Sequence, residues 1–175
     1  MQAPQAGLTQ ESCKNPAMQS DITLDAVDRR ILQVLQSQGR ITYDELAAGV
    51  GLSASATLRR VKRLEEVGVI SGYVALVAPE RVGLGLTAYI NVRLAKHAEQ
   101  RSPTDAFAAS VQAWPEVVEC AALTGEMDYL LRVLVRDMEH YSRFIMDSLL
   151  KHPAVQDCKT SFMMRRLKGT TAVPL

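Results

Sequence analysis

Hydrophobic residues follow a helical period in the first half of the chain and a strand period in the second half. From Leu24 onward, apolar residues recur with the spacing of one helix face, which predicts a helix that is buried on one side. From Leu86 to Leu94, apolar and polar residues alternate, which is typical of a half-buried strand. The change of period predicts two folded units of different architecture, and we place the boundary near Pro79.

The stretch from Thr42 to Gly68 predicts two consecutive helices joined by a glycine turn. Thr42 and Glu45 have the spacing of a capping box, which satisfies free backbone amides at a helix start. Gly51 tolerates a positive φ and breaks the first helix. Ser53 suits the N-cap of the second helix, and Gly68 suits its end. With the helix that precedes it, this pair predicts a small three-helix unit.

The second of these helices has an apolar face and a basic face. At about 100° per residue, Leu58, Val61 and Leu64 lie together and are expected in the core. The opposite side carries Ser55, Ala56, Arg59, Lys62 and Arg63, with Arg60 at its edge. Small residues let a helix approach a DNA groove, and cations meet phosphates and base edges. An ordinary amphipathic helix with a solvated basic face is the alternative. The capped helix, glycine turn and capped basic helix together favour a helix-turn-helix.

The second half predicts the order strand, helix, strand, strand, helix, strand. The strands are expected at 86–94, 117–123, 129–135 and 155–164, and the helices begin at Ser102-Pro103 and Asp137. This order is that of the ferredoxin-like βαββαβ fold, so the fold class is α+β. The helices of such a fold cover one face of the sheet. The other face needs a partner, which favours homo-oligomerisation.

The predicted boundaries give two units and two tails. Residues 1–22 are rich in Gln, Ala, Ser and Pro and are expected to be a disordered tail. Residues 23–78 form the helix-turn-helix unit with a linker strand, because VISGYVALVAP has the β-branched and aromatic content of a strand or wing. Residues 79–167 form the second unit, and residues 168–175 form a C-terminal tail.

Composition adds little to this picture except through local charge. The 175 residues have a formal net charge of +1 and are 47% hydrophobic, so overall charge does not indicate a nucleic-acid partner. The cations are instead crowded between Arg59 and Arg63. The chain has no apolar run long enough for a membrane span. The 3 cysteines are odd in number and far apart, which fits a reducing cytoplasm and neither a disulfide framework nor a zinc site.

The sequence lacks motifs for catalysis. The letters GLGLTA at 83–88 match a dinucleotide fingerprint, but they precede a strand instead of following one, so we reject dinucleotide binding. The histidines have no ligand-like spacing, and no metal site is predicted. We therefore predict that the protein is not an enzyme. The competing hypothesis is a stand-alone amino-acid-binding module that regulates an enzyme by contact, against which the basic helix argues.

Three stretches carry a family resemblance. They are LDAVDRRILQVLQSQGRITYDELAAGVGLS, RVKRLEEVGVISGYVALVAP and ECAALTGEMDYLLRVLVRDMEHY. Together and in this order, they resemble the leucine-responsive regulatory protein/AsnC (Lrp/AsnC) family of transcriptional regulators, from about Leu24 to Met164. The resemblance implies a winged-helix-like DNA-binding domain and a C-terminal ACT-like effector domain, called RAM. It also implies sequence-specific binding to double-stranded operator DNA, an amino acid as effector, and dimers that assemble further, often into octamers.

The resemblance places the helix-turn-helix at Tyr43 to Lys62. The predicted DNA-binding residues are Tyr43, Ser53, Ser55, Ala56, Thr57, Arg59, Arg60, Lys62 and Arg63. Arg59, Arg63 and Ser55 are expected to face the groove. Arg60 and Lys62 are expected mainly on phosphates.

The family's effector region corresponds to the turn from Thr124 to Asp128, at an interface between dimers. The predicted effector-binding residues are Ala122, Thr124, Gly125, Glu126, Met127, Asp128, Met138, Ser161, Phe162 and Met163. A glycine turn offers amides to a carboxylate, Asp128 suits an ammonium group, and Met or Phe lines an apolar slot. The alternative is that Gly125 and Asp128 only shape the hairpin. No cofactor is expected besides the effector. Glu126 and Ser161 depart from the family's usual residues, so the resemblance does not name leucine.

Overall fold

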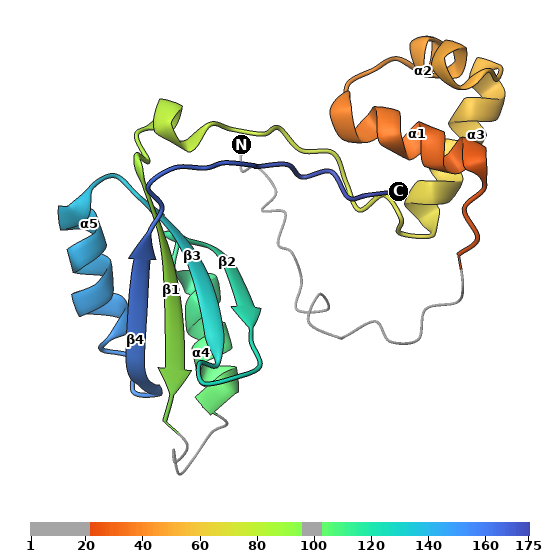
Figure 1. Cartoon of the computed structure of the whole chain (residues 1–175). Coiled ribbons are helices and arrows are strands. Elements are labelled where there is room, and N and C mark those ends of the chain that lie inside the picture. The colour runs from red at the N-terminus through yellow and green to blue at the C-terminus, as the bar shows by residue number, and fades with distance from the viewer. Residues whose placement is uncertain (1–21, 96–102) are drawn as a thin grey trace, which may run out of the picture. The chain divides into compact units, whose positions relative to one another are not determined.

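The computed structural model describes residues 22–95 and 103–175, and these residues divide into two compact units (Figure 1). The first unit holds the chain up to Val74 together with the C-terminal segment Thr170–Leu175. The second unit runs from Ala75 to Gly169. Each unit has its own hydrophobic core.

The division of the chain differs slightly from the sequence-based expectation. We placed the boundary after residue 78, whereas the division falls between Val74 and Ala75. The expected disordered tail, residues 1–22, lies outside the described residues except for Ile22.

Three helices form the first unit, and each begins at a side-chain cap. They are α1 (Ala26–Ser37), α2 (Tyr43–Val50) and α3 (Ala54–Glu66). The Glu45 amide donates to the Thr42 hydroxyl at 3.3 Å, and the Thr42 amide donates to the Glu45 carboxylate at 3.0 Å, which is the predicted capping box. Gly51 ends α2 with a φ of 73°. At the start of α3, the Ala56 amide donates to the Ser53 hydroxyl at 3.3 Å. Local sequence therefore sets the helix-turn-helix.

One face of each helix packs into a small apolar core. Its buried residues are Ile31, Leu32, Leu46, Val50, Val61 and Leu64. The prediction that Leu58 belongs to this core is wrong, because Leu58 is only half-buried and is not among the core residues. Thr57 takes that place, with 0% of its surface exposed. Thr57, Val61 and Leu64 follow the helical spacing, so they share one face of α3.

The linker after α3 forms no strand, contrary to the sequence-based expectation. A strand needs a hydrogen-bonded neighbour, and no described residue pairs in a sheet with residues 69–78. The apolar side chains of the linker are exposed instead: Val74 is 82% exposed and Leu76 is 74% exposed. A short 3-10 helix, Pro79–Val82, follows.

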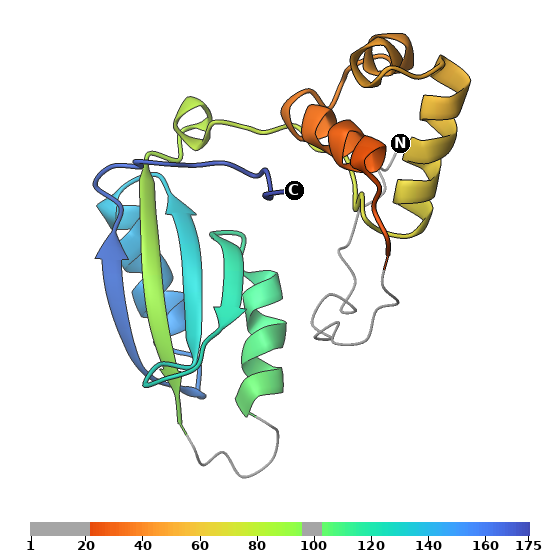
Figure 2. The same cartoon turned by 45° about the vertical axis from the view of Figure 1, so that its right-hand side comes forward.

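An antiparallel four-stranded sheet with helices on one face forms the second unit (Figures 1 and 2). Its elements are β1 (Leu86–Leu94), α4 (Pro103–Ala113), β2 (Val117–Ala122), β3 (Tyr129–Val135), α5 (Met138–Arg143), a π-helix (Phe144–Leu149) that continues α5, and β4 (Val155–Phe162). The strand order is β2-β3-β1-β4. The unit therefore has the predicted βαββαβ fold, and the whole chain is α+β.

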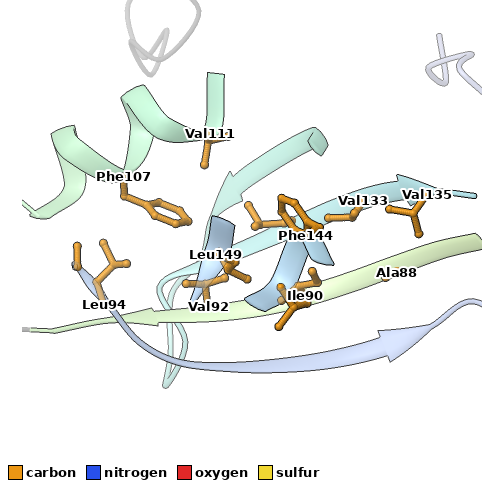
Figure 3. Close-up of a cluster of buried hydrophobic side chains, with 13 residues drawn as sticks. Ala88, Ile90, Val92, Leu94, Phe107, Val111, Val133, Val135, Phe144 and Leu149 are labelled. Atoms are coloured by element: carbon orange, nitrogen blue, oxygen red, sulfur yellow. The ribbon is translucent and has the colours of Figure 1, made fainter. Parts of the chain in front are cut away.

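The core of the second unit lies between the sheet and its helices (Figure 3). Alternate residues of β1, such as Ile90 and Val92, point into it and have 0% exposure. Phe107 of α4 and Phe144 at the start of the π-helix enter from the helical layer. The Asp137 carboxylate caps α5 by accepting from the His140 amide, as the sequence predicts for Asp137.

The opposite face of the sheet mixes polar and apolar side chains and is largely half-buried, with Leu130 and Leu134 of β3 beside its polar residues. Tyr89 and Arg93 alternate with the core residues of β1. Arg93 pairs with Asp157 of β4 at 3.2 Å, and Arg132 of β3 pairs with Glu119 of β2 at 3.0 Å. No described helix of this unit covers the face (Figure 2).

The C-terminal segment contacts α1 through a reciprocal pair of hydrogen bonds. The Gln36 side-chain amide donates to the Val173 carbonyl at 3.2 Å, and the Val173 amide donates to the Gln36 side-chain oxygen at 2.6 Å. This pair places Thr170–Leu175, which we expected as part of a tail, in the first unit.

Candidate functional site

A basic face runs along the exposed side of α3. Arg59 and Lys62 are exposed, and the side chains of Arg63 and Arg60 are 50% and 32% exposed. Ser55 is exposed near the start of the helix. The shallow concavity along this face is lined by Asp25, Ser55, Leu58, Arg59, Arg60, Lys62, Arg63 and Glu66. Cations outnumber carboxylates in it, so the face favours an anionic ligand.

Two of the four cations are tied to carboxylates at the start of α1. Arg60 contacts Asp25 at 2.7 Å and Asp28 at 2.8 Å, and Arg63 contacts Asp28 at 2.9 Å. Hydrogen bonds from the Asp28 amide and from Arg60 lower the pKa of Asp25, and bonds to both carboxylates raise the pKa of Arg60. The sequence places Arg60 mainly on phosphates, and the structure adds contacts of its Nη1 with these two carboxylates. Within the described residues, Arg59 and Lys62 have no ion-pair partner.

The other predicted DNA-binding residues differ in their access to solvent. Tyr43, the first residue of α2, is 43% exposed. Ser53 caps α3 and lies 3.2 Å from Ser55, hydroxyl to hydroxyl. Ala56 is half-buried. The prediction that Thr57 contacts DNA is wrong, because its side chain is wholly buried in the core of the first unit.

The start of the linker is fastened to α3. The Tyr73 hydroxyl donates to the Glu65 carboxylate at 2.9 Å. Burial and the neighbouring Glu65 raise the pKa of Tyr73 to about 12. The hydroxyl of Tyr73 therefore stays protonated to a higher pH than that of an ordinary tyrosine.

The predicted effector turn is held by the side chain and backbone of Asp128. The Asp128 amide donates to the Val92 carbonyl at 2.9 Å, and the Leu123 amide donates to the Asp128 carbonyl at 2.8 Å. One carboxylate oxygen of Asp128 accepts from the Leu94 amide at 2.7 Å. Gly125 has a φ of 121°, in the range that favours glycine. The alternative reading of Gly125 and Asp128 as turn formers therefore has direct geometric support.

Ala122 ends β2 beside this turn, whereas the other predicted effector residues lie at the opposite end of the sheet. Phe162 pairs with Ala88 in the ladder, and its ring lies 4.8 Å from that of Tyr141, centroid to centroid. The Met163 amide donates to the Thr87 carbonyl at 2.9 Å. Ser161 belongs to the same strand, and Met138 is the first residue of α5.

The two groups of predicted effector residues are therefore far apart within one chain. Asp128 is bonded to Val92 and Met163 to Thr87, five residues away on β1. At the rise of an extended strand, this separation is about 16 Å. One small ligand cannot touch both groups in a single chain.

Comparison with known proteins decides the family. Residues 24–71 match the model of a winged helix-turn-helix DNA-binding domain, and residues 87–173 match that of the Lrp/AsnC ligand binding domain. The transcriptional regulator AzlB of Bacillus subtilis is 37% identical over 154 residues, which cover 88% of this chain and 97% of that protein. The leucine-responsive regulatory protein of Escherichia coli is 39% identical over 145 residues, covering 83% and 87%. The chain belongs to the Lrp/AsnC family.

Solved structures of Lrp/AsnC relatives have the same fold. A transcriptional regulator from Neisseria meningitidis, NMB0573, was solved as a complex with L-Met; it is 49% identical, with a TM-score of 0.83, over 87% of this chain and 97% of that one. An AsnC family regulator from Agrobacterium tumefaciens is 36% identical with a TM-score of 0.80, over 86% and 97%.

Membership of the Lrp/AsnC family gives each unit its role. The protein is a DNA-binding transcriptional regulator with a winged helix-turn-helix unit and a ligand-binding unit. The relatives are regulators, which confirms the prediction that it is not an enzyme. Within residues 22–95 and 103–175, no helix is long and apolar enough to cross a membrane, and no cluster of His, Cys, Asp or Glu is placed to hold a metal ion.

Two residues of the basic face were missed from the sequence. Asp25 and Asp28 were not among the predicted site residues, and their contacts with Arg60 and Arg63 join segments 32–35 residues apart. Asp28 lies on the buried side of α1 and yet is charged. A buried Asp in an otherwise apolar face was the available signal, since such a group needs a partner.

Proposed function

We propose that this Lrp/AsnC regulator reads double-stranded promoter DNA with the exposed face of α3. The exposed Arg59 and Lys62, which lack ion-pair partners among the described residues, carry the proposal. Arg59, Arg63 and Ser55 face the bases, and Lys62 contacts phosphate. Tyr43, Ser53 and Ala56 lie at the starts of α2 and α3, where these helices meet the phosphate backbone of the DNA. Regulation of promoters places the protein with the DNA, in the cytoplasm.

Two variants separate base reading from phosphate contact. Arg59→Ala removes a potential bidentate contact to guanine and should reduce discrimination between specific and non-specific DNA by about 1–3 kcal/mol. Lys62→Ala should weaken all DNA alike and lower the salt slope by about 1. Titrations of labelled duplexes at several salt concentrations measure both quantities. The probe is a duplex that the full chain selects from a random library, and scrambled DNA is the control. Unchanged discrimination by Arg59→Ala would contradict the assignment.

We infer that the effector is a free amino acid. The turn from Thr124 to Met127 is exposed or half-buried, and the second carboxylate oxygen of Asp128 has no bond to the described part of the chain, so it is available to an ammonium group. Phe162 and Met138 are 39% and 55% exposed and offer an apolar slot. The Neisseria relative bound L-Met, which supports the same ligand class for this chain.

The distance between the two effector groups favours a site that two copies complete. The turn of Asp128 from one copy and the Phe162 end of the sheet from another would then meet around one amino acid, with Ala122, Gly125, Glu126, Ser161 and Met163 among the lining residues. The half-buried open face of the sheet, with Tyr89, gives a further surface for a copy. We propose dimers that assemble into a larger ring, an octamer in the simplest case.

A thermal-shift screen of the common amino acids tests the effector proposal. A ligand that binds only the folded state stabilises it by about 2.7 kcal/mol at 100 times its Kd. We expect at least one amino acid at millimolar concentration to raise the melting temperature of the full chain. Asp128→Asn should reduce this shift, whereas Arg143→Gln, an exposed α5 control, should leave it unchanged. No shift with any amino acid would contradict the proposal.

A further inference from the structure

The contacts between α1 and α3 form a connected network of four charged side chains. The Asp28 side chain is only 2% exposed, and it accepts from Arg60 through one oxygen and from Arg63 through the other. The Asp25 side chain, 50% exposed, accepts from Arg60 through Oδ2 at 2.7 Å. A buried carboxylate with two guanidinium partners is held in one geometry, because an unpaired charge there is costly.

The carboxylates are also fixed from the α1 side. The Asp28 amide donates to Oδ1 of Asp25 at 2.7 Å, and the Asp25 amide donates to Oδ2 of Asp28 at 3.4 Å, which forms a capping box. All four carboxylate oxygens therefore accept a hydrogen bond. The start of α1 presents α3 with an acceptor platform, which consists of the Asp25 and Asp28 carboxylates held in fixed positions.

The two arginines use this platform differently. Arg60 places a single nitrogen, Nη1, between both carboxylates. Arg63 contacts Asp28 through Nη2 alone, and its side chain is 50% exposed. Within the described residues, Nε and Nη1 of Arg63 have no partner. One end of that guanidinium is held while its other donors face solvent.

We propose that Asp28, assisted by Asp25, is a positioning residue that sets DNA specificity through Arg63. Arg60 has a different role, which is to hold α1 and α3 together. The proposal rests on the DNA-reading face described under Proposed function. Asp28 orients the guanidinium of Arg63 toward a base edge, so less freedom is lost when DNA binds. Arg60 contributes no phosphate contact, because its Nη1 is held between both carboxylates and its side chain is only 32% exposed.

The salt dependence of DNA binding separates Arg60 from a phosphate-binding cation. Each phosphate contact adds about 0.9 to the slope of log K against log salt. Lys62→Gln should lower the slope by about 0.9, whereas Arg60→Gln should leave it unchanged within error. Equal losses of slope in the two variants would overturn the role of Arg60.

A double-mutant cycle tests whether Asp28 acts through Arg63. The readout is the ratio of affinities for the library-selected duplex and for scrambled DNA, measured with the full chain. Asp28→Asn and Arg63→Gln should each reduce this ratio, by about 5- to 150-fold for Arg63→Gln. Asp28→Asn should have almost no further effect in the Arg63→Gln background. An equal effect of Asp28→Asn in both backgrounds would overturn the proposal, since it would then not act through Arg63.

A loss of folding must be distinguished from a loss of specificity. The use of an affinity ratio as the readout, and a milder variant, serve this purpose. Partial unfolding lowers both affinities together and leaves their ratio unchanged, and circular dichroism gives the folded fraction. If Asp28→Asn does not fold, Asp28→Glu, which keeps the charge but displaces the carboxylate, replaces it in the same cycle with Arg63→Gln, and an equal effect of Asp28→Glu in both backgrounds would overturn the proposal. If Lys62→Gln and Arg63→Gln both bind DNA normally, the proposed reading face itself is wrong, a result distinct from failure of the cycle.

Discussion

We expect Leu64→Ala to destabilise the helix-turn-helix unit by about 2–5 kcal/mol, because it opens a cavity in a small core. Leu64 has 0% exposure and packs with Val61 and Leu46 in the only core of that unit that the described residues form. Leu58→Ala removes the same side-chain atoms from a residue of α3 that lies outside the core. Its cost should be about 1 kcal/mol or less, because Leu58 is half-buried outside the core.

The single tryptophan makes this experiment selective. Trp114 lies in the second unit, so its fluorescence reports that unit alone. Thermal unfolding of Leu64→Ala followed by circular dichroism should show an early loss of helix, while the fluorescence transition stays where it is in the unaltered protein. A larger loss of stability for Leu58→Ala than for Leu64→Ala would mean that α3 is rotated about its axis so that Leu58 faces the core.

The second large effect is expected for Phe107→Ala, at about 3–5 kcal/mol on the ligand-binding unit. Phe107 has 0% exposure, and its ring lies 5.9 Å from Trp114, 5.0 Å from Tyr129 and 5.6 Å from His152, centroid to centroid. Removing it takes away the aromatic contacts that join α4 to β3 and to the loop before β4. Urea unfolding followed by Trp114 fluorescence measures the change.

Phe162→Ala is the matched control for Phe107→Ala. Phe162 lies in the same unit, but it is 39% exposed and packs mainly on Tyr141. We expect it to cost less stability than Phe107→Ala and to weaken the response to an amino acid instead. If both phenylalanine variants destabilise the unit equally, Phe162 is a core residue and the apolar effector slot is misplaced.

Helix starts and the inward and outward positions of β1 were predictable because short-range chemistry determines them. Thr42 with Glu45, Ser53 and Asp137 supply caps that depend on residues three positions away, and each cap is present in the structure. The alternation along β1 likewise required only the pleat of a strand. These features do not depend on distant parts of the chain.

The two errors on α3 arose in different ways. Leu58 was placed inside because the apolar face was assigned from hydrophobic residues alone, and Thr57 was placed among the DNA-binding residues by the family resemblance. The structure turns the helix so that Thr57 is buried with Val61 and Leu64, and Leu58 borders the basic concavity. Hydropathy ranks leucine as more apolar than threonine, so it does not indicate that Thr57 is the buried residue.

Contacts between distant segments were the second limit. The pairing of Arg60 with Asp25 and Asp28 was not predicted, because these carboxylates lie more than thirty residues away along the chain. The linker strand failed for the same reason, since a strand requires a neighbour that no described residue provides. The effector residues were carried over by position, and their separation on the sheet became visible only from the register of β1 with β3 and β4.

The central claim is that an amino acid bound by the second unit controls DNA binding by the first. Reciprocal titration tests it most directly: DNA affinity of the full chain with and without a saturating amino acid from the screen, and amino acid affinity with and without DNA. The account predicts that each ligand changes the affinity for the other by the same factor, about 5- to 150-fold. An unchanged DNA affinity at saturating amino acid would contradict it.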